Sequence, residues 1–383
     1  MKYDRSRQNL VIFPKGRIDS STAATVQEEI FEITKNVPNF KKLILDFSDV
    51  EYISSAGLRT ILKVKQTYDD LSIIETSLEV YDTFSMTGFT ELMEIRKALR
   101  KIDISNAKVI GDGFFSTVYR LDGDTIVKVF NRTSDPHQIE RELKLAKQAF
   151  ILGIPTALSF DIVKAGDKLG VVFEMLDCNS LKTMVSEHPE KASEYTDKYV
   201  QLLKKINTTE CESPEIPKMK DFYLTKVEGI KPYLDKKHYE KLKTVISNIE
   251  DRKTFIHGDC HFKNIMVQGE DLILIDMDTL SVGHPIFEFA QLYAPYCAFE
   301  EDEPGNVKSF LGIEAEDAKV LFHALLTRYI GKEDPVILDK IKLVAYLHMV
   351  WWTTVNQPDN KTRLNGCKER LLSLLDKYDD VNF

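Results

Sequence analysis

Residues 257–264 read HGDCHFKN, and an apolar strand-like stretch, a QGED turn and a second apolar stretch follow them. Two short apolar runs joined by turn-forming residues predict a β-hairpin. Folding this hairpin about its turn brings Asn264 and Asp276 to the same open end, with Asp259 a few residues away. The segment therefore predicts that an amide oxygen and two carboxylates lie close together.

This set of side chains suits the transfer of a phosphoryl group to a hydroxyl. Such a reaction needs hard oxygen ligands for Mg²⁺, and a carboxylate that orients the attacking hydroxyl and accepts its proton. We expect Asn264 and Asp276 to hold Mg²⁺ and Asp259 to be the catalytic base. Each acid taken alone would be an ordinary solvated loop residue, so the expectation rests on the joint pattern and its spacing.

A candidate phosphate-binding turn lies upstream, where residues 111–116 read GDGFFS between two predicted strands. The small residues Gly111, Gly113 and Ser116 would let backbone N–H groups approach phosphate oxygens, although a lone G-x-G is also an ordinary hairpin turn. The next predicted strand carries Lys128 between two valines, which favours one buried and one cleft-facing side. Lys128 would then reach the phosphates of a nucleotide; the alternative is a lysine on the strand surface.

The helix predicted after this strand offers two acidic partners for Lys128. At about 100° per residue, Glu142 lies about 70° from the centre of the apolar helix face and Glu140 about 90° from it. Either glutamate would flank the buried face and pair with Lys128, and the smaller angle favours Glu142.

Composition bounds the class of protein. The chain has 383 residues, more than the roughly 250–300 that one hydrophobic core supports, so we expect at least two domains. Hydrophobic residues make up 43% and charged residues 29%, as in soluble globular proteins, and a net charge of −9 argues against nucleic acid as a partner. The acidic balance mildly favours cationic or neutral substrates, although solubility alone also explains it.

The cysteines and the hydropathy pattern indicate the cellular compartment in which the protein works. The five cysteines are scattered, odd in number and never in a C-x-x-C pair, which indicates free thiols in a reducing compartment. The first residues contain no apolar signal-like segment, and no apolar run reaches the roughly 18 residues of a membrane span. We therefore expect a cytoplasmic protein with no membrane partner.

The chain divides into two predicted domains. Strand-like and helix-like stretches alternate over roughly the first hundred residues, which predicts an α/β layered domain. Its last helix is expected at about residues 90–99. After residue 106 the pattern changes to successive antiparallel strands, and beyond residue 176 it is mostly helical apart from the hairpin. We place the first domain at 1–102 and the second at 103–383.

The octapeptide HGDCHFKN matches the H-G-D-x-H-x-x-N catalytic loop of the aminoglycoside phosphotransferase and choline kinase branch of the kinase-like fold. It resembles this loop better than the H-R-D loop of typical protein kinases. Residues 275–278 (IDMD) resemble the I-D-x-[DE] motif of that branch, and residues 283–290 (GHPIFEFA) resemble its G-D-P-x-x-D-L-A segment. Two positions depart from the pattern: Glu288 stands where an aspartate is usual, and Ser116 replaces the third glycine of a full Gly-rich loop.

The resemblance implies an α+β protein-kinase-like domain of two lobes, with an antiparallel sheet in the N-lobe, about 103–176, and mostly helices in the C-lobe, about 177–383. It also implies ATP and Mg²⁺ as cofactors and a small molecule with a hydroxyl as the acceptor. The hinge between the lobes would be residues 173–176, where the backbone of Glu174 and Leu176 would hydrogen-bond the adenine. An ordinary buried strand end is the alternative for this segment.

The acceptor side is much harder to read. In the family that the chain resembles, the acceptor binds among the C-terminal helices, where residues 300–303 read EEDE. Such a run would attract a polyamine or an aminoglycoside-like cation, and a solvated acidic loop is the alternative. The sequence does not identify the acceptor.

Residues 45–59 read LDFSDVEYISSAGLR and resemble the STAS domain of anti-sigma-factor antagonists. In that family a partner kinase phosphorylates a serine at a helix N-terminus, and the matching position here is Ser55, with Ser54 in place of the usual aspartate. A phosphate there would be stabilised by the helix dipole and would alter the binding surface. The alternative is that either serine only caps the helix.

These observations and resemblances predict an ATP-dependent phosphotransferase that moves the γ-phosphate to a hydroxyl of a small molecule, with a regulatory STAS module that binds a protein partner. One alternative is a regulatory protein whose kinase-like domain phosphorylates a protein, with Ser55 of the same chain as a candidate. Another is a module that binds nucleotide without turnover.

Overall fold

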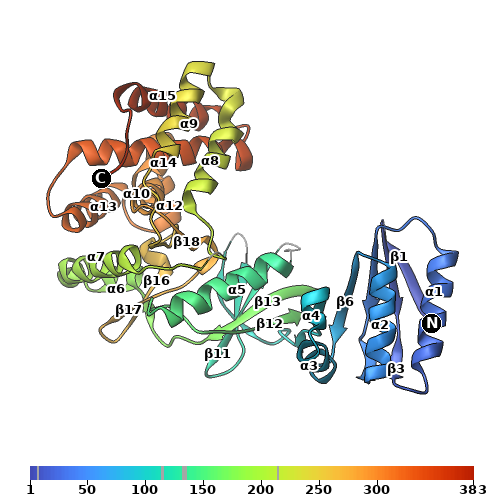
Figure 1. Cartoon of the computed structure of the whole chain (residues 1–383). Coiled ribbons are helices and arrows are strands. Elements are labelled where there is room, and N and C mark those ends of the chain that lie inside the picture. The colour runs from blue at the N-terminus through green and yellow to red at the C-terminus, as the bar shows by residue number, and fades with distance from the viewer. Residues whose placement is uncertain (7, 114–115, 132–135, 214) are drawn as a thin grey trace. The chain divides into compact units, whose positions relative to one another are not determined.

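The computed structural model describes the chain except for residues 7, 114–115, 132–135 and 214. It contains two compact units (Figure 1), which are Met1–Asp103 with Val163–Asp167, and Ile104–Ile162 with Lys168–Phe383. Within the described ranges, none of the helices combines the length and the apolarity that crossing a bilayer requires.

A mixed five-stranded sheet forms the centre of the first unit. Its order is β1-β2-β4-β6-β7, in which β1 runs antiparallel to β2 and the other neighbours are parallel. The strands are β1 (Lys2–Ser6), β2 (Asn9–Phe13), β4 (Lys42–Asp46), β6 (Leu71–Thr76) and β7 (Glu94–Lys97). A separate parallel pair consists of β3 (Lys15–Ile18) and β5 (Asp49–Ile53), and β8 is Arg100–Ile102.

Amphipathic helices bury their apolar faces in this unit. They are α1 (Ala23–Asn36), α2 (Ser55–Thr67), α3 (Leu78–Met86) and α4 (Phe89–Leu92). In α2, Leu58, Ile61 and Val64 recur at helical spacing and join the core formed by the strands. The alternation of strands with helices confirms the α/β layered domain that the sequence predicts.

The predicted last helix of this domain is wrong. The chain forms only the single turn α4 and then the strand β7, in which Ile95 is buried and pairs with Ile73. An apolar residue that can complete a sheet edge gains more from that packing than from local helix propensity, which is a weak preference.

An antiparallel sheet begins the second unit, as the sequence predicts. The strands β9 (Lys108–Asp112), β10 (Ser116–Arg120), β11 (Thr125–Phe130) and β13 (Lys168–Glu174) pair antiparallel, and β12 (Ser159–Ala165) is the other neighbour of β13. The turn before β11 is closed by Asp122, whose Oδ1 accepts from the backbone N–H groups of Asp124 and Thr125 at 2.8 and 2.7 Å. The helix α5 (Pro136–Ile151) packs Ile139 against Phe130 and Val171 of the sheet.

The rest of the second unit is mainly helical. Its helices are α6 (Leu181–Glu187), α7 (Ala192–Thr208), α8 (Met219–Ile230), α9 (Lys236–Ser247), α10 (Ile286–Tyr293), α11 (Phe299–Glu301), α12 (Asn306–Leu311), α13 (Ala315–Ile330), α14 (Pro335–Asn356) and α15 (Lys361–Lys377). A π-helix, η5 (Ala294–Ala298), follows α10 directly. The short strands are β14 (Asn179–Ser180), β15 (Phe255–Ile256), β16 (Ile265–Gln268), β17 (Asp271–Leu274) and β18 (Ser281–Val282). The longest helix, α14, packs against α8, α10 and α15.

Burial of the side chains of α14 contributes strongly to the stability of this helical part of the second unit. Leu343, Val344, Leu347 and Val350 are each fully buried, and full burial of such a side chain stabilises the fold by about 1.5–3 kcal/mol. The helices around α14 therefore form one large core that gives the hairpin β16–β17 a rigid support.

Candidate active site

The hairpin β16–β17 forms as the sequence predicts. Ile265 pairs with Leu274, and the backbone N–H of Ile275 donates to the carbonyl oxygen of Asn264 at 3.0 Å. Asn264 and Asp276 therefore leave the hairpin at the same end.

Asp259 and Asn264 are joined directly by hydrogen bonds. The Asn264 Nδ2 donates to the Asp259 side-chain Oδ2 at 2.9 Å and to its backbone oxygen at 3.0 Å. These bonds use the amide nitrogen of Asn264 and leave its Oδ1 for another ligand. His261 lies on the other side of the carboxylate, with its Nε2 3.4 Å from the Asp259 Oδ1.

Lys128 of β11 connects the sheet to the hairpin. Its Nζ lies 2.6 Å from the Oδ1 of Asp276 and 3.1 Å from the Oε1 of Glu142 in α5, the glutamate that the helix geometry favours. Desolvation alone would lower the pKa of Lys128, but the two carboxylates raise it above its ordinary value, so the lysine is a cation. Burial raises the pKa of the Glu142 carboxyl, and the Lys128 ammonium opposes that rise.

The backbone at Asp276 is unusual. Its φ of 65° and ψ of 69° are left-handed, a region that costs a residue other than glycine of the order of 1–3 kcal/mol. Such strain is kept where the surroundings determine the conformation, and here it directs the carboxylate of Asp276 to Lys128.

Glu288 of α10 holds the loop that carries Asp259. Its buried carboxylate accepts from the backbone N–H of His257 at 2.7 Å and of Gly258 at 3.1 Å. Burial raises the pKa of Glu288 to about 7, and the two N–H groups oppose the rise. The residue that departs from the family pattern thus still braces the loop, through both carboxylate oxygens.

His257 joins the same loop to β17. The backbone N–H of Asp259 donates to its Nδ1 at 3.2 Å, so its Nε2–H donates to the carbonyl of Ile275, also at 3.2 Å. Burial lowers the pKa of this fully buried imidazole to about 4, which keeps it neutral and in one tautomer. Two tyrosines add further contacts to the loop: the Tyr296 hydroxyl accepts from the N–H of Phe262 at 2.9 Å, and the Tyr199 hydroxyl donates to the carbonyl of Cys260.

A cavity of about 420 Å³ lies beside Lys128 and Asp276. Its wall includes five of the candidate nucleotide-binding residues, which are Gly111, Ser116, Lys128, Glu174 and Leu176. Its other walls are largely apolar, as is typical of sites for flat ring systems, and contain Ile110, Val118, Ile126, Phe173, Met175, Met266 and Met277. Phe173 and Met175 belong to the predicted hinge, residues 173–176. The other five apolar residues are not among the predicted site residues, although the alternation along the strands contains that signal.

Two family models match the chain. The model of the phosphotransferase enzyme family matches residues 106–310, and the model of the STAS domain matches residues 1–102. The chain belongs to the phosphotransferase enzyme family. It carries a STAS domain fused to a kinase-like phosphotransferase domain, which confirms the two predicted resemblances and the predicted fold class.

Among solved structures, the chain is similar to several aminoglycoside phosphotransferases. APH(2'')-Ib with ADP bound is 16% identical, and the match covers 72% of this chain and 93% of that chain with a TM-score of 0.48. The complex of gentamicin with APH(2'')-IIa is 14% identical, with coverages of 80% and 99% and a TM-score of 0.48. APH(3'')-Id from Streptomyces rimosus is 12% identical, with coverages of 59% and 93% and a TM-score of 0.37. No curated protein matches the sequence.

Two of the candidate nucleotide-binding residues of this phosphotransferase are bonded to neighbouring residues of the chain. Gly113 is not part of the cavity wall, and its N–H donates to the carbonyl of Ser116 at 2.9 Å, which closes the turn. The residues between them, Phe114 and Phe115, lie outside the described part of the chain. In the hinge, two hydrogen bonds join Glu174 to Leu158. The backbone N–H of Glu174 donates to the Leu158 carbonyl at 2.9 Å, and the Glu174 carboxylate accepts from the Leu158 N–H at 2.7 Å.

The oxygen donors of this phosphotransferase fit Mg²⁺. Desolvation and the negative charges of Asp276 and Asp278 raise the pKa of the Asp259 carboxyl, although 44% of its side chain is exposed. Such crowding of carboxylates is relieved by a divalent cation. The described residues contain no cluster of three His, Cys, Asp or Glu side chains for a metal.

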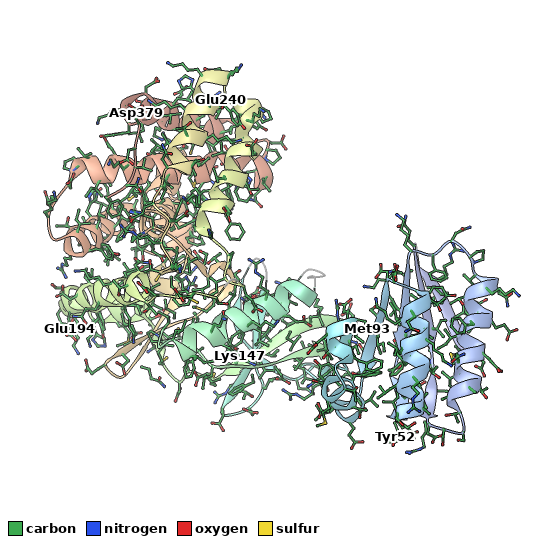
Figure 2. The ribbon with its side chains drawn as sticks, viewed as in Figure 1. Tyr52, Met93, Lys147, Glu194, Glu240 and Asp379 are labelled. Carbon is green, nitrogen blue, oxygen red and sulfur yellow. The ribbon has the colours of Figure 1, made fainter. Side chains whose placement is uncertain are left out.

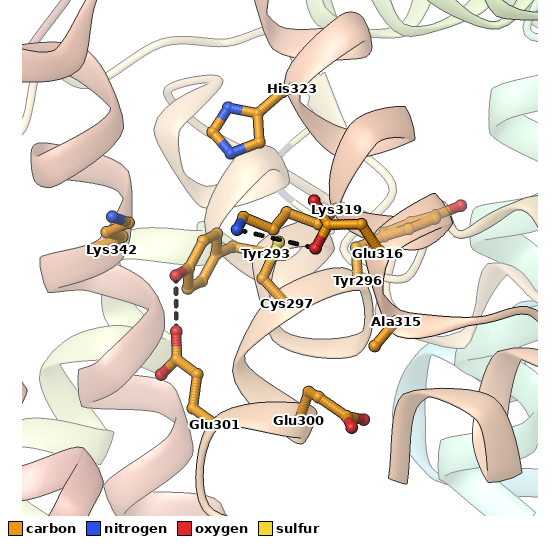
Figure 3. A pocket seen from close by; sticks show the side chains of 10 residues that line it. All are labelled: Tyr293, Tyr296, Cys297, Glu300, Glu301, Ala315, Glu316, Lys319, His323 and Lys342. Carbon is orange, nitrogen blue, oxygen red and sulfur yellow. Dashed lines mark hydrogen bonds and ion pairs between the residues drawn. The ribbon is translucent and has the colours of Figure 1, made fainter. Parts of the chain in front are cut away.

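The acidic run at residues 300–303 is engaged within its own lobe. Both Glu300 carboxylate oxygens accept backbone N–H groups, from Gly305 at 2.7 Å and Val307 at 3.2 Å. Glu301 accepts from the hydroxyls of Tyr293 and Tyr346 at 2.8 Å each, and the first of these bonds is drawn in Figure 3. The remaining carboxylates pair with arginines of α15, Asp302 with Arg370 and Glu303 with Arg363.

Ser55 is exposed at the start of α2 in the STAS domain. The cap is formed by the preceding residue, because the Ser54 Oγ accepts from the N–H of Ala56 at 3.2 Å. Tyr52, labelled in Figure 2, lies three residues before Ser55 and is 41% exposed, with the Arg17 guanidinium 4.0 Å from its ring centre. The Ser55 hydroxyl is therefore not used as the cap.

Proposed function

We propose that this phosphotransferase moves the γ-phosphate of ATP to the hydroxyl of a small molecule, and that it works in the cytoplasm. The proposal is supported above all by the contact of Lys128 with both Glu142 and Asp276 at one end of the cavity. At the same end of the hairpin, Asp259 is bonded to Asn264. A cation, oxygen ligands and a carboxylate base are the groups that phosphoryl transfer requires.

The cavity wall supports the nucleotide part of the proposal. Its apolar surfaces would bind the adenine, and the backbone of Glu174 and Leu176 would hydrogen-bond the ring. Gly111, Gly113 and Ser116 would approach the phosphates from the turn. Lys128 would bind them through its ammonium, whose place is determined by Glu142.

The loop residues would position and activate the acceptor. The Asp259 carboxylate would accept the hydroxyl proton, and its hydrogen bond from Asn264 holds it in one orientation. Glu288 and His257 keep the backbone of this loop in place. Asn264, through its Oδ1, and Asp276 would hold Mg²⁺, which when bound would neutralise charge on the transferring phosphoryl group.

We include the STAS domain in the proposal as the part that binds a protein partner. Ser55 is proposed as a phosphorylation site, because it is exposed, begins a helix and is free of the capping role. A phosphate at this helix N-terminus would be stabilised by the dipole and would add about two negative charges to the surface. The second candidate function follows: the kinase-like domain phosphorylates a protein, with Ser55 of the same chain as one substrate.

The test is incubation of the purified chain with labelled ATP and Mg²⁺, alone and with a panel of hydroxyl-bearing metabolites and antibiotics. We expect label to move to one class of small molecule and to stop moving in Asp259→Asn. Label on Ser55 that is lost in both Asp259→Asn and Ser55→Ala would instead support the second candidate. Nucleotide binding with no transfer to any acceptor would leave only a nucleotide-binding module and reject both.

A further inference from the structure

An aromatic wall lies beside the proposed catalytic base. The His261 ring, whose Nε2 is 3.4 Å from Asp259, meets the Phe310 ring edge-on at 5.3 Å between centres. Phe310 in turn meets the Phe299 ring edge-on at 5.5 Å. Phe310 remains 37% exposed, so part of this wall is available for contact with an apolar group.

Two lysines lie next to this wall. The Lys263 Nζ lies 4.7 Å from the centre of the Phe310 ring and donates to the Phe310 carbonyl at 2.9 Å. The side chain of Lys182 in α6 lies against Gly312, the residue that ends α12. A Cβ built on Gly312 would be only 2.7 Å from the Nζ of Lys182. The two ammonium groups act on each other electrostatically. Among the residues that the structure describes, no carboxylate forms an ion pair with either lysine, although the charge of Asp259 acts on Lys263. The charge of Lys182 in particular is available to a ligand.

The acidic residues that suggested a cationic acceptor do not offset these lysines. Glu300 is bonded to two backbone N–H groups, and Glu301 to two tyrosine hydroxyls. Asp302 and Glu303 face the arginines of α15. Each of these carboxylates already has hydrogen-bond or ion-pair partners within the lobe, which leaves fewer of its lone pairs for a ligand cation.

We infer that the acceptor is a hydroxyl compound with a negatively charged group and an apolar or aromatic body. This inference rests on the proposed function. Lys182 and Lys263 bind the anionic group, and Phe310 packs against the body. The acceptor oxygen attacks the γ-phosphorus and the bond from that phosphorus to the ADP oxygen breaks. The hydroxyl proton passes to Asp259, leaving ADP and a phosphomonoester.

A matched series of probes tests the sign of the charge. The compounds 4-(hydroxymethyl)benzoate, benzyl alcohol and 4-(aminomethyl)benzyl alcohol share a ring and a hydroxyl and differ in being anionic, neutral and cationic. Titration calorimetry on the full chain, with Mg²⁺ and a non-hydrolysable ATP analogue, measures their affinities. We expect the anion to bind at least about tenfold more tightly than the cation, as one charge-assisted contact allows.

Variants of Lys182 test whether the preference for the anion comes from this lysine. Lys182→Gln should weaken binding of the anion by about tenfold, and Lys182→Glu should reverse the order of anion and cation. Lys332→Gln, which changes a surface lysine paired with Asp334, is the matched control and should leave the order unchanged. Unchanged affinity for the ATP analogue shows that each Lys182 variant is folded.

Two results would overturn the inference: a cation bound as tightly as the anion, or no binding of the anion up to its solubility limit. The binding assay needs no turnover, so it separates this inference from the proposed function. If the anion binds as expected but no label moves from ATP to any acceptor, phosphoryl transfer is rejected and the charge preference is retained.

Discussion

At the scale of single residues, the chemistry depends on how Asp259 is held. Its side chain is bonded to Asn264, its backbone N–H to His257, and the residue before it to Glu288. The carboxylate thus has a determined orientation before any acceptor arrives. Preorganisation of this kind is what removes the cost of orienting a base during the reaction.

Asp259→Asn should lower kcat by roughly 10²–10⁴ with little change in nucleotide affinity, because it removes only proton acceptance and orientation of the hydroxyl. Steady-state kinetics with the best acceptor measure the first effect, and calorimetry with an ATP analogue measures the second. Turnover close to that of the wild type would exclude Asp259 as the base.

Lys128→Met should mainly impair use of the nucleotide. It removes the ammonium between Glu142 and Asp276, so two carboxylates lose their shared cation and the phosphates lose a ligand. We expect KM for ATP to rise by about tenfold or more. Lys147→Met is a suitable control. Lys147 lies in α5 (Figure 2), but it donates to the carbonyl of Phe160 at 3.1 Å. Unchanged ATP kinetics in Lys128→Met would contradict its assignment.

Glu288→Gln tests the brace of the loop. Two backbone N–H groups point at the carboxylate, and an amide offers only one acceptor oxygen, so one donor would lose its partner. A buried donor without a partner costs about 1–3 kcal/mol. We expect the free energy of unfolding in urea to fall by about that amount and kcat to fall with it; a variant as stable and active as the wild type would refute the brace.

At the scale of helices and strands, the elements set by local sequence patterns are predictable, and those set by contacts between distant segments are not. The hairpin ending at Asp276 was predictable because its turn and its apolar runs are contiguous. The strand β7 was missed because its burial depends on pairing with β6, which no local pattern contains. The contacts of Tyr199 and Tyr296 with the loop were also missed, since they come from helices 61 and 34 residues away.

The packing of α8 against α14 contains a buried lysine that gives a pH-dependent prediction. Lys226 is 8% exposed, its Nζ lies 2.8 Å from the Nδ1 of His348, and the Tyr223 ring is 4.1 Å away. Burial lowers the pKa of Lys226 to about 7. A depressed lysine pKa means that the unfolded chain binds more protons between pH 7 and 10.5. Stability therefore rises with pH across this window, and the loss at low pH is complete once the pH has fallen through about 7.

Lys226→Met should remove this dependence, because methionine keeps the length of the side chain without a charge. We expect the free energy of unfolding at pH 7 to rise by about 1–3 kcal/mol, and the increase between pH 7 and 10 to become smaller. Urea unfolding at several pH values measures both effects. Lys231→Met, at the exposed end of the same helix, is the control and should change neither.

At the scale of the whole molecule, the two compact units have separate cores. One core contains Leu43 and the other sheet residues of the STAS domain, and the other contains the helices around α14. Each unit therefore has the packing to unfold as a cooperative body of its own.

Scanning calorimetry should resolve two transitions, of which Mg²⁺ with an ATP analogue shifts only one. A ligand at one hundred times its Kd stabilises the unit that binds it by about 2.7 kcal/mol. Leu43→Ala should lower the midpoint temperature of the STAS transition only, because deleting a buried leucine side chain reduces the free energy of unfolding of that unit by roughly 2–5 kcal/mol. One transition that responds as a whole to both changes would show that the units unfold together.

The loop bearing Asp259 is pinned from three helical elements, through Tyr199 of α7, Glu288 of α10 and Tyr296 of η5. An unbiased genetic selection for inactive alleles should therefore recover substitutions at these three codons beside those in the cleft. Such alleles would be misjudged as simple folding defects if only their distance from bound ligands were considered. Their products should bind nucleotide while failing in the transfer step.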